Sequence, residues 1–524
     1  MIKKISAAKP PLVVLVVLDG FGLAKPNIGN AITLAKPRFF ESLTKNYPYT
    51  ELCASGRCVG LPPTQDGNSE AGHLNIGAGR VVLQDSVRIS EDINDGSFFK
   101  NQAFESAYQH VKKNHSALHL LGMLSGVQSG HVDPDHLLAL LTWARLKKID
   151  KVYLHLFTDG RDSPKFSSLQ YLEALLRSLN NQELVGTIMG RFYGMDRKKI
   201  WSRTELAYNA LVLGEGLVAR SPQAAITQSY NQGISDEFIP PYVLFNNNKP
   251  VPRLSDNDAV IFFNLRSDRA RQLTKAFIQP DFNQLNPGSF KRKKVLKNLC
   301  FVALTDFGPD LDSILSAFPS IDVKHTLPIE LAKIRQLYIA ENEKYAHVTY
   351  FFNGGYANPV NGEKRILIPS PNVISYDQKP QMSAKKITQR VLKAIRQNEF
   401  DFFTINYANA DMVGHTGNLE ATIKAIKVVD QELKKLVAAV LQKNGTVIIT
   451  ADHGNAEEMI KLKTNENDTQ HSSFPVPVVI VNKKFKGQKI KPVQPLLTLA
   501  CIAPTILKLY QLPIPKEMTG KSLI

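Results

Sequence analysis

Short apolar runs rich in β-branched residues alternate along the chain with segments whose apolar residues recur at the helical period. The runs expected to form buried strands are Leu12–Leu18, Val152–Phe157, Val185–Met189, Ala259–Asn264, Phe301–Thr305, Phe402–Asn406, Val447–Thr450 and Val476–Val481. The segments expected to form helices include His136–Lys147, Ser383–Gln397 and Leu419–Gln442. This alternation predicts an α/β fold in which helices cover both faces of parallel sheets.

The length and composition predict a globular protein with more than one domain. The chain has 524 residues, which exceeds what one core usually holds, and 43% of them are hydrophobic and 21% charged. The formal net charge of +17 predicts attraction to anions such as phosphorylated metabolites, nucleic acid or acidic membranes. Basic runs such as Lys291–Lys294 lack interleaved aromatic residues, so solvated lysine is the simpler interpretation, and we expect no specific nucleic-acid partner.

The cysteines and the N-terminal region indicate the compartment. The four cysteines form no Cys-x-x-Cys pair, so we expect reduced, buried thiols at Cys53, Cys58, Cys300 and Cys501. The run Leu12–Leu18 is too short for a membrane span, and no small-residue cleavage site follows it. These features predict a soluble cytoplasmic protein with no membrane partner.

Aspartate and histidine side chains follow three of the strand-like runs. They are Asp19 after the first run, Asp411 and His415 after Phe402–Asn406, and Asp452, His453 and His471 after Val447–Thr450. The carboxyl ends of parallel strands are where an open α/β sheet builds its active site. Mixed Asp and His ligands suit Mn²⁺, Zn²⁺ or a similar divalent cation. The pattern therefore predicts a metal-dependent enzyme with two ions.

Each of these residues also has a plainer interpretation. Asp411 and His415 are four residues apart, which would place them on one face of a helix, but the glycines around His415 indicate a loop, which can still wrap an ion. The pair Asp452 and His453 is by itself a polar turn, and His471 by itself a solvated loop histidine. Their joint position after strands favours the metal site.

Two further groups of polar residues are candidates for the chemistry. Ser69 lies among small residues in Gly67–His73, where a metal-bound hydroxyl would be a nucleophile, although from the local sequence alone a helix cap or turn is the better explanation of this serine. Five arginines follow three other strand-like runs: Arg161, Arg191, Arg197, Arg266 and Arg269. Arginine binds phosphate and carboxylate bidentately, so these residues predict a pocket for a small anion. Asp162 lies among them as a candidate general base.

Seven blocks of sequence resemble the cofactor-independent phosphoglycerate mutases of the alkaline-phosphatase superfamily. The blocks are GNSEAGHLNIGAGR (67–80), TDGRD (158–162), MGRFYGMDR (189–197), FFNLRSDRARQL (262–273), ENEKYAHVTYFFNGG (341–355), NYANADMVGHTG (406–417) and TADHGNAE (450–457). The resemblance runs in order from Leu12 to the end of the chain. It implies interconversion of 3-phosphoglycerate and 2-phosphoglycerate in glycolysis and gluconeogenesis, with another phosphomutase or phosphatase of the superfamily as the alternative.

The resemblance also implies roles for individual residues. Ser69 would become phosphoserine, Asp162 would be the general base, and Lys344 would lie near the transferring phosphoryl group. One metal would be held by Asp411, His415 and His471, and the other by Asp19, Ser69, Asp452 and His453. The phosphoglycerate would be bound by His131, Arg161, Asp162, Arg191, Arg197, Arg266 and Arg269. The metals would be Mn²⁺, or Mg²⁺ or Co²⁺ in some members, with no requirement for 2,3-bisphosphoglycerate.

The domain organisation that the resemblance implies is a phosphatase-like metal domain split in sequence, with a phosphoglycerate-binding domain inserted. We place the metal domain at residues 1–84 and 319–524 and the inserted domain at 85–318, and we expect a monomer. The family's Gly-Gly-Val-His-Ser-His loop is altered here to Ser125-Gly-Val-Gln-Ser-Gly-His131. Matching Gly-Val puts Gln128 at the histidine position, whereas counting back from His136 puts His131 there, and we prefer His131.

Other classes are disfavoured by specific residues. A sulfatase requires a Cys/Ser-x-Pro-x-Arg nucleophile motif, which the sequence after Ser69 lacks. A simple phosphatase would not need the inserted arginines. Ser267 stands where many members of the family have proline, a change that affects loop stiffness more than chemistry.

Overall fold

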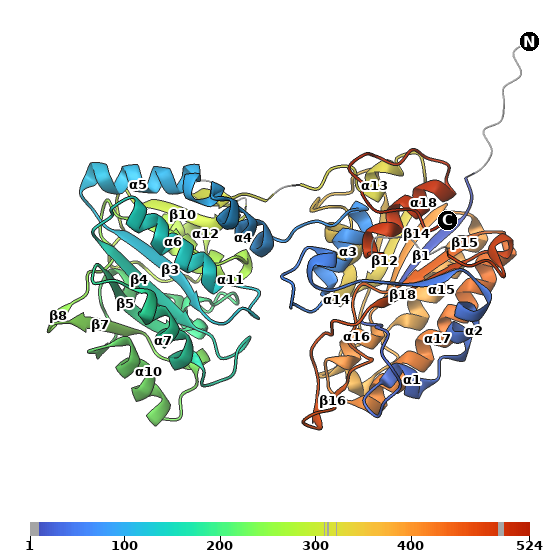
Figure 1. Ribbon diagram of the computed structural model, residues 1–524, viewed down its shortest axis with the longest axis horizontal. Helices are drawn as coiled ribbons and strands as arrows, with labels where there is room; N and C mark the ends of the chain where they lie inside the picture. The colour runs from blue at the N-terminus through green and yellow to red at the C-terminus, as the bar shows by residue number, and fades with distance from the viewer. Residues whose placement is uncertain (1–9, 309, 312–313, 321, 491–496) are drawn as a thin grey trace, which may run out of the picture. The chain divides into compact units, whose positions relative to one another are not determined.

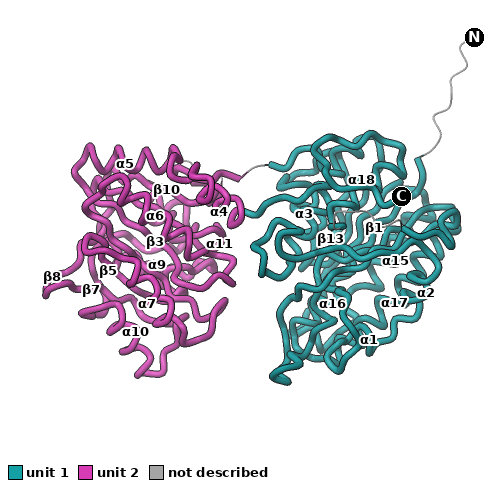
Figure 2. The backbone as a smooth tube through the Cα atoms, viewed as in Figure 1, with its two compact units in different colours: residues 1–84, 322–524 teal, residues 85–321 magenta. Residues whose placement is uncertain are grey.

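The computed structural model describes residues 10–308, 310–311, 314–320, 322–490 and 497–524. The chain divides into two compact units (Figure 2): unit 1 comprises residues 1–84 and 322–524, and unit 2 residues 85–321. Each unit has its own sheet and its own hydrophobic core. The second division therefore falls after residue 321, where the sequence-based boundary was placed after residue 318.

The main sheet of unit 1 has, among the described residues, seven strands (Figure 1). Their order is β13 (Lys364–Ile368), β12 (Gln336–Glu341), β14 (Phe402–Tyr407), β1 (Val13–Leu18), β15 (Thr446–Thr450), β18 (Val476–Val481) and β2 (Tyr49–Leu52). The strands from β13 to β15 are parallel, as the sequence predicts, but β18 is antiparallel to both of its neighbours. An antiparallel return needs no crossover helix, and β15 and β18 are indeed joined without one.

The central strand of unit 1 is β1, which lies between β14 and β15. All six of its residues are apolar and no more than 2% exposed, which is typical of a strand covered on both faces. Leu18 is in register with Tyr407 of β14, and Val17 with Thr450 of β15. The residues that follow these three strands therefore meet at one edge of the sheet.

The helices of unit 1 form two groups, each with internal contacts. One consists of α1 (Ala31–Ala35), α2 (Arg38–Asn46), α15 (Ala384–Gln397), α16 (Asn409–Gly414) and α17 (Leu419–Gln442), in which α17 contacts the other four. The other contains α3 (Ser69–Ala78), α13 (Leu327–Glu330), α18 (Ile502–Leu509) and the π-helical turn η4 (His347–Phe351). Asn418 caps α17 by accepting a hydrogen bond from the Ala421 amide.

Unit 2 is built on a second, mostly parallel sheet. Its strand order is β11 (Leu315–Phe318), β10 (Cys300–Thr305), β9 (Ala259–Phe262), β3 (Leu118–Leu124), β4 (Val152–Thr158), β5 (Glu183–Gly190), β7 (Tyr242–Asn246) and β6 (Leu217–Ala219), with β8 (Lys249–Pro250) paired to β7. The principal helices are α5 (Gln102–Asn114), α6 (Pro134–Leu146), α7 (Ser168–Ser178), α9 (Trp201–Val212), α10 (Pro222–Asn231) and α11 (Ser267–Ile278). The strands from β11 to β5 are all parallel, so their carboxyl ends share one edge.

The cysteines differ from expectation. Cys53 and Cys58 form a disulfide, whereas Cys300 and Cys501 are free thiols. The short 3₁₀ turn η1 (Gly56–Val59) brings the two Cα atoms to 5.8 Å, within the range of a disulfide, and the expectation of four reduced thiols was therefore wrong. Within the described segments, no helix combines the length and hydropathy needed to cross a bilayer.

Candidate active site

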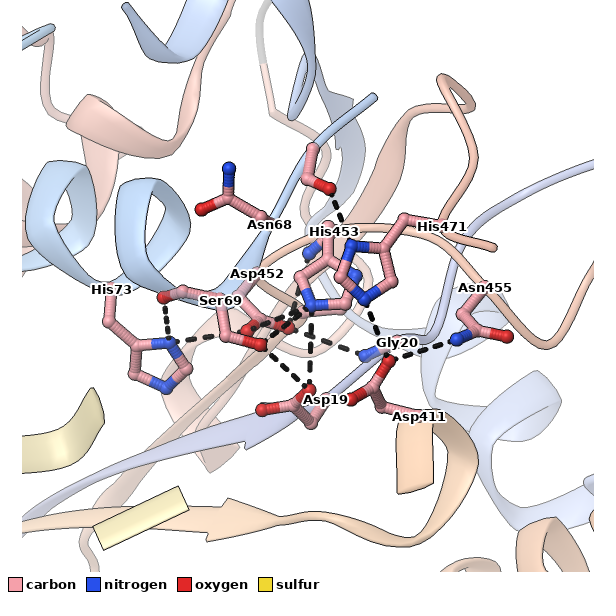
Figure 3. Close-up of polar contacts among 12 residues, drawn as sticks. Asp19, Gly20, Asn68, Ser69, His73, Asp411, Asp452, His453, Asn455 and His471 are labelled. Atoms are coloured by element: carbon pink, nitrogen blue, oxygen red, sulfur yellow. Dashed lines mark hydrogen bonds and ion pairs between the residues drawn. The ribbon is translucent and has the colours of Figure 1, made fainter. Parts of the chain in front are cut away.

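Three carboxylates meet at the edge of the unit 1 sheet (Figure 3). Asp19 follows β1, Asp452 follows β15, and Asp411 lies in α16, just after β14. The Asp411 amide donates a hydrogen bond to the Asp19 carbonyl at 3.1 Å. Gly20 permits this approach, because a Cβ there would lie 2.7 Å from the Asp411 Cα, and its φ of +70° favours glycine. All three carboxylates are at most 1% exposed.

Two histidines converge on one oxygen of Asp411. His415 Nε2 lies 3.2 Å and His471 Nε2 3.3 Å from Asp411 Oδ1, and the two nitrogens are 3.0 Å apart. A backbone carbonyl fixes the orientation of each imidazole ring. His415 Nδ1 lies 2.7 Å from the Thr469 carbonyl, and His471 Nδ1 lies 2.9 Å from the Gly67 carbonyl. His415 directly follows α16, so the helical interpretation of this spacing is confirmed and the loop interpretation was wrong.

The second group surrounds Ser69. His453 Nε2 lies 3.5 Å from Asp19 Oδ1 and 3.5 Å from Asp452 Oδ2, and Ser69 Oγ lies 2.8 Å from the same nitrogen. Ser69 Oγ also donates to Asp19 Oδ1 at 3.3 Å. Ser69 is the first residue of α3 and Asn68 is its cap, so the interpretation of Ser69 as a helix cap was wrong. The hydroxyl thus stands at the positive end of a helix dipole.

One buried lysine reaches into both groups. Lys344 Nζ lies 2.6 Å from Asp19 Oδ1, 2.6 Å from Asp411 Oδ2 and 2.8 Å from Ser69 Oγ. It is carried by α14 (Asn342–Ala346), which follows β12 in the same sheet. The surrounding carboxylates more than offset the effect of burial and raise the pKa of Lys344, so the side chain is an ammonium at neutral pH.

The charge balance of this cluster fits divalent cations. Burial, reinforced by the Asp452 carboxylate, raises the pKa of Asp19 to about 7. Burial opposes ionisation of Asp411 as well, but Lys344 and the hydrogen bonds of His415 and His471 hold its pKa well below the ordinary value. Asp452 Oδ2 is buried, with His73 Nδ1 at 3.2 Å and His453 Nε2 at 3.5 Å. Three buried carboxylates facing one ammonium carry surplus negative charge, which is what a cation site requires.

In unit 2, as in unit 1, polar residues follow the carboxyl ends of parallel strands, but here most of them are arginines. Asp159, Arg161 and Asp162 follow β4, Arg191 opens the short helix α8 (Arg191–Gly194) after β5, and Arg266 and Arg269 follow β9. The most deeply buried of these arginines is Arg191, which is 2% exposed. Its Nη1 lies 2.5 Å from Asp159 Oδ1 and 3.0 Å from Asp162 Oδ2. Asp159 therefore anchors the arginine, and Asp162 lies beside it.

The remaining arginines lie nearer the surface. Arg197 Nη1 is 2.5 Å from Asp268 Oδ2 with a side chain 52% exposed, and Arg161 Nη1 is 3.8 Å from Glu237 Oε1 with a side chain 56% exposed. Burial, followed by the positive charges of Arg191, Arg197 and Arg161, lowers the pKa of Arg269. These guanidinium groups repel one another and would gain from an anion between them.

His131 belongs to this arginine cluster, whereas Gln128 is exposed. Gly130, next to His131, leaves space for Arg266, whose Nη1 would lie 3.4 Å from a Cβ at that glycine. Burial, with Arg191 next in size, lowers the pKa of His131 to about 4, so its ring is neutral at pH 7. Of the two candidates for the loop position, His131 is therefore the one that faces the arginines.

Comparisons with known proteins place the chain in a family. The model of the Metalloenzyme superfamily matches residues 12–514. A Clostridium kluyveri 2,3-bisphosphoglycerate-independent phosphoglycerate mutase is 48% identical over 518 residues, which are 98% of this chain and 99% of the relative. A Clostridioides difficile protein of the same name is 46% identical over 518 residues, with the same shares of both chains. The chain belongs to the 2,3-bisphosphoglycerate-independent phosphoglycerate mutases.

A solved structure of this family has the same fold. The phosphoglycerate mutase of Leishmania mexicana, determined at low cobalt concentration, is 29% identical and superposes with a TM-score of 0.76 over 98% of each chain. The two-unit α/β architecture is therefore that of a phosphoglycerate mutase of this kind.

Sequence reasoning missed polar residues directly behind the unit 1 cluster. Asn406 is the last residue but one of β14, His73 lies one helical turn after Ser69, and Asn455 follows the Asp452–His453 pair. The four-residue spacing from Ser69 to His73 was a usable signal for that histidine. Nothing in the local sequence marks the two asparagines, because their partners are more than forty positions away in the chain.

Proposed function

We propose that the chain interconverts 3-phosphoglycerate and 2-phosphoglycerate without 2,3-bisphosphoglycerate, through a phosphoserine at Ser69. Family membership supports the reaction. The role of Ser69 rests on the position of its hydroxyl. Ser69 is the first residue of α3, and its Oγ lies 2.8 Å from both Lys344 Nζ and His453 Nε2. A phosphoryl group there would be stabilised by the ammonium and the helix dipole.

Divalent cations would occupy two ligand groups in unit 1. Asp411, His415 and His471 would hold one, and Asp19, Ser69, Asp452 and His453 the other. These donors fit Mn²⁺ best, with Mg²⁺ or Co²⁺ as alternatives. When bound, the cations lower the pKa of the Ser69 hydroxyl and neutralise charge on the phosphoryl oxygens. Asp19 is placed to accept a hydrogen bond from the hydroxyl, and Lys344 is placed to donate to it.

Unit 2 would hold the glycerate. Arg161, Arg191, Arg197, Arg266, Arg269 and His131 would bind its carboxylate and hydroxyl oxygens while the phosphoryl group resides on Ser69. Asp162 would take the proton from the hydroxyl that receives the phosphoryl group. Although burial opposes ionisation, Arg191 keeps the pKa of Asp162 below its ordinary value, so the base is available at neutral pH. Asp162 also accepts a hydrogen bond from Ser129 Oγ at 3.0 Å, which fixes its orientation.

These roles make unit 1 the metal domain and unit 2 the phosphoglycerate-binding domain, so the bounds expected from the sequence, 1–84 with 319–524 and 85–318, move by three residues at the second division. We expect the enzyme to act as a cytoplasmic monomer on its small-molecule substrate alone. Size-exclusion chromatography with light scattering tests the monomer, and a dimer mass would overturn it.

The test of the function is a coupled assay on 3-phosphoglycerate, with Mn²⁺ supplied and 2,3-bisphosphoglycerate omitted. The wild type should form 2-phosphoglycerate, and mass spectrometry of rapidly quenched enzyme should find phosphate on Ser69. Ser69→Ala should lose both signals and keep the fold. Release of inorganic phosphate without 2-phosphoglycerate would instead identify a phosphatase. Near-normal turnover by Ser69→Ala would rule out the phosphoserine route.

A further inference from the structure

Two buried asparagines lie behind the carboxylates of unit 1. The Asn406 Nδ2 donates to Asp19 Oδ2 at 2.7 Å, and the Asn455 Nδ2 donates to Asp411 Oδ1 at 2.9 Å. Both asparagines are at most 1% exposed. Figure 3 shows the Asn455 amide directed at Asp411. Each amide thus contacts a different ligand group.

Asn406 acts together with His73. Its Nδ2 lies 3.1 Å from His73 Nε2, and His73 Nδ1 lies 2.9 Å from the Ser69 carbonyl and 3.2 Å from Asp452 Oδ2. The two oxygens facing Nδ1 are acceptors, so Nδ1 carries the proton and Nε2 accepts from Asn406. The two hydrogens of the Asn406 amide are therefore divided between Asp19 and His73. Asn406 and His73 therefore link Asp19 to Asp452.

Asn455 acts on the other group. Asp411 Oδ1, to which it donates, is the oxygen that His415 and His471 also face. The Asn455 side chain has room only because residue 414 is glycine, where a Cβ would lie 2.4 Å from Asn455 Oδ1. The Asn455 backbone amide donates to Glu457 Oε2 at 3.0 Å, which fixes the loop that carries it.

Both amides leave one polar atom unpaired. Asn406 Oδ1 and Asn455 Oδ1 are buried and have no hydrogen-bond partner among the described residues. Burial of an unpaired carbonyl is unfavourable, and an apolar residue of similar shape would avoid it. The donor half of each amide is therefore the part that serves the site.

We propose that Asn406 with His73 and Asn455 are positioning residues that serve the two metal groups separately. The Asn406–His73 pair holds Asp19 and Asp452 in their ligating orientation, and Asn455 holds Asp411. The proposal rests on the two-cation centre of the proposed function. Outer partners of this kind typically change metal affinity by about 10- to 100-fold when removed.

The test measures Mn²⁺ binding by calorimetry on the metal-free full chain, independently of activity. His471→Ala disables the group around Asp411, so the titration then reports the group around Asp19. In that background Asn406→Leu should weaken binding about 10- to 100-fold, and Asn455→Leu by less than about threefold. In the Asp452→Ala background, which reports the group around Asp411, the order of the two effects should reverse.

The matched control is Asn353→Leu. Asn353 is also buried, donates from Nδ2 to a carboxylate (Glu363 Oε1, 2.8 Å) and has an unpaired Oδ1, but it touches neither metal group. It should leave Mn²⁺ affinity unchanged in both backgrounds. If a leucine variant fails to fold, the serine variant replaces it, because its side chain is too short to reach the carboxylate.

Three outcomes separate the inference from the function on which it rests. The crossed pattern supports separate positioning. Equal weakening of both groups by each asparagine variant, or no weakening, overturns it while leaving the two-cation centre intact. A wild type that binds no Mn²⁺ defeats the metal centre itself, and the inference with it.

Discussion

The two units build oppositely charged clusters on the same kind of edge. In unit 1 the residues after β1, β14 and β15 are carboxylates and imidazoles, and in unit 2 the residues after β4, β5 and β9 are mainly arginines. Parallel topology decides where the polar residues gather, and the side chains decide which ion they attract. In both units the site therefore forms at the carboxyl ends of parallel strands, with a cation-binding character in unit 1 and an anion-binding character in unit 2.

The clusters also differ in burial. The carboxylates of unit 1 are at most 1% exposed and share the single ammonium of Lys344, whose side chain is 5% exposed. In unit 2 the Arg191–Asp159 pair is as deeply buried, but Arg161 and Arg197 are more than half exposed. Solvent screens the exposed charges of unit 2, so the energetic consequences of losing one charge should be larger in unit 1.

The largest expected effect is that of removing the cations. Chelation with EDTA should lower activity by about a thousandfold or more, and Mn²⁺ should restore it, because cation stabilisation of the transferring group is worth several kcal/mol. Hydrogen exchange should show Mn²⁺ protecting α3 and α16 but not β4 or β5, since both candidate groups found among the described residues lie in unit 1. Activity that does not change on chelation would contradict the assignment of a catalytic cation site to unit 1.

Lys344→Met should have the next largest effect. It leaves two buried carboxylates without their counter-charge, which costs about 3–5 kcal/mol in the metal-free protein. Mn²⁺ should restore stability, because it supplies the missing charge, but activity should stay about a hundredfold down. Thermal melts with and without Mn²⁺ measure the stability, and the coupled assay measures the activity. The control is Lys293→Met, which breaks a surface pair with Glu215 (2.8 Å) and should change neither property.

Arg269→Gln should affect substrate binding rather than stability. We expect KM for 3-phosphoglycerate to rise about tenfold or more, from the loss of a charge-assisted hydrogen bond, with Mn²⁺ affinity unchanged. Stability without substrate should hold or rise, because Arg269 lies among repelling guanidinium groups. Steady-state kinetics and melts measure the two quantities. Arg177→Gln, on an exposed pair with Glu173 in α7, is the control. A lower melting temperature with unchanged KM would contradict the assignment.

The smallest expected effect is on the pH dependence of stability. The pKa of His131 falls from 6.5 to about 4 on folding, so between those values the unfolded chain binds the extra proton. Stability is therefore complete above pH 6.5 and declines as the pH falls toward 4, by about 2 kcal/mol at pH 5. His131→Gln should reduce that decline, as measured by urea unfolding at pH 7 and pH 5. An unchanged decline would mean that His131 is not held neutral.

Three strands that carry the unit 1 cluster were predictable from sequence. The apolar runs that became β1, β14 and β15 are continuous, and each ends within a few residues of a ligand candidate. The strand β3 was not predicted, because His119 and Gly122 interrupt its apolar run. His119 is nevertheless fully buried, since Asp258 accepts its hydrogen bond at 3.1 Å.

Other features depend on partners that are distant in the sequence or on local backbone geometry, and they could not be predicted from the sequence. Asn406 looks like any polar residue at a strand end until β14 pairs with β1 and brings Asp19 within 2.7 Å of its amide. The Cys53–Cys58 pair becomes bondable only through the turn between the two residues. The helix α16 forms despite Gly414, because Asp411 and its neighbours are buried against the sheet edge and against α17.

The position of β1 between β14 and β15 has a consequence for synthesis on the ribosome. Val13 is in register with Phe402 and Thr446, so the centre of the unit 1 sheet stays unpaired until most of the chain has been made. Every strand in the described part of unit 2 lies between residues 118 and 318 and emerges before β14 and β15. A nascent chain therefore holds an exposed, wholly apolar strand while unit 2 folds, and that interval is when the protein most needs chaperones.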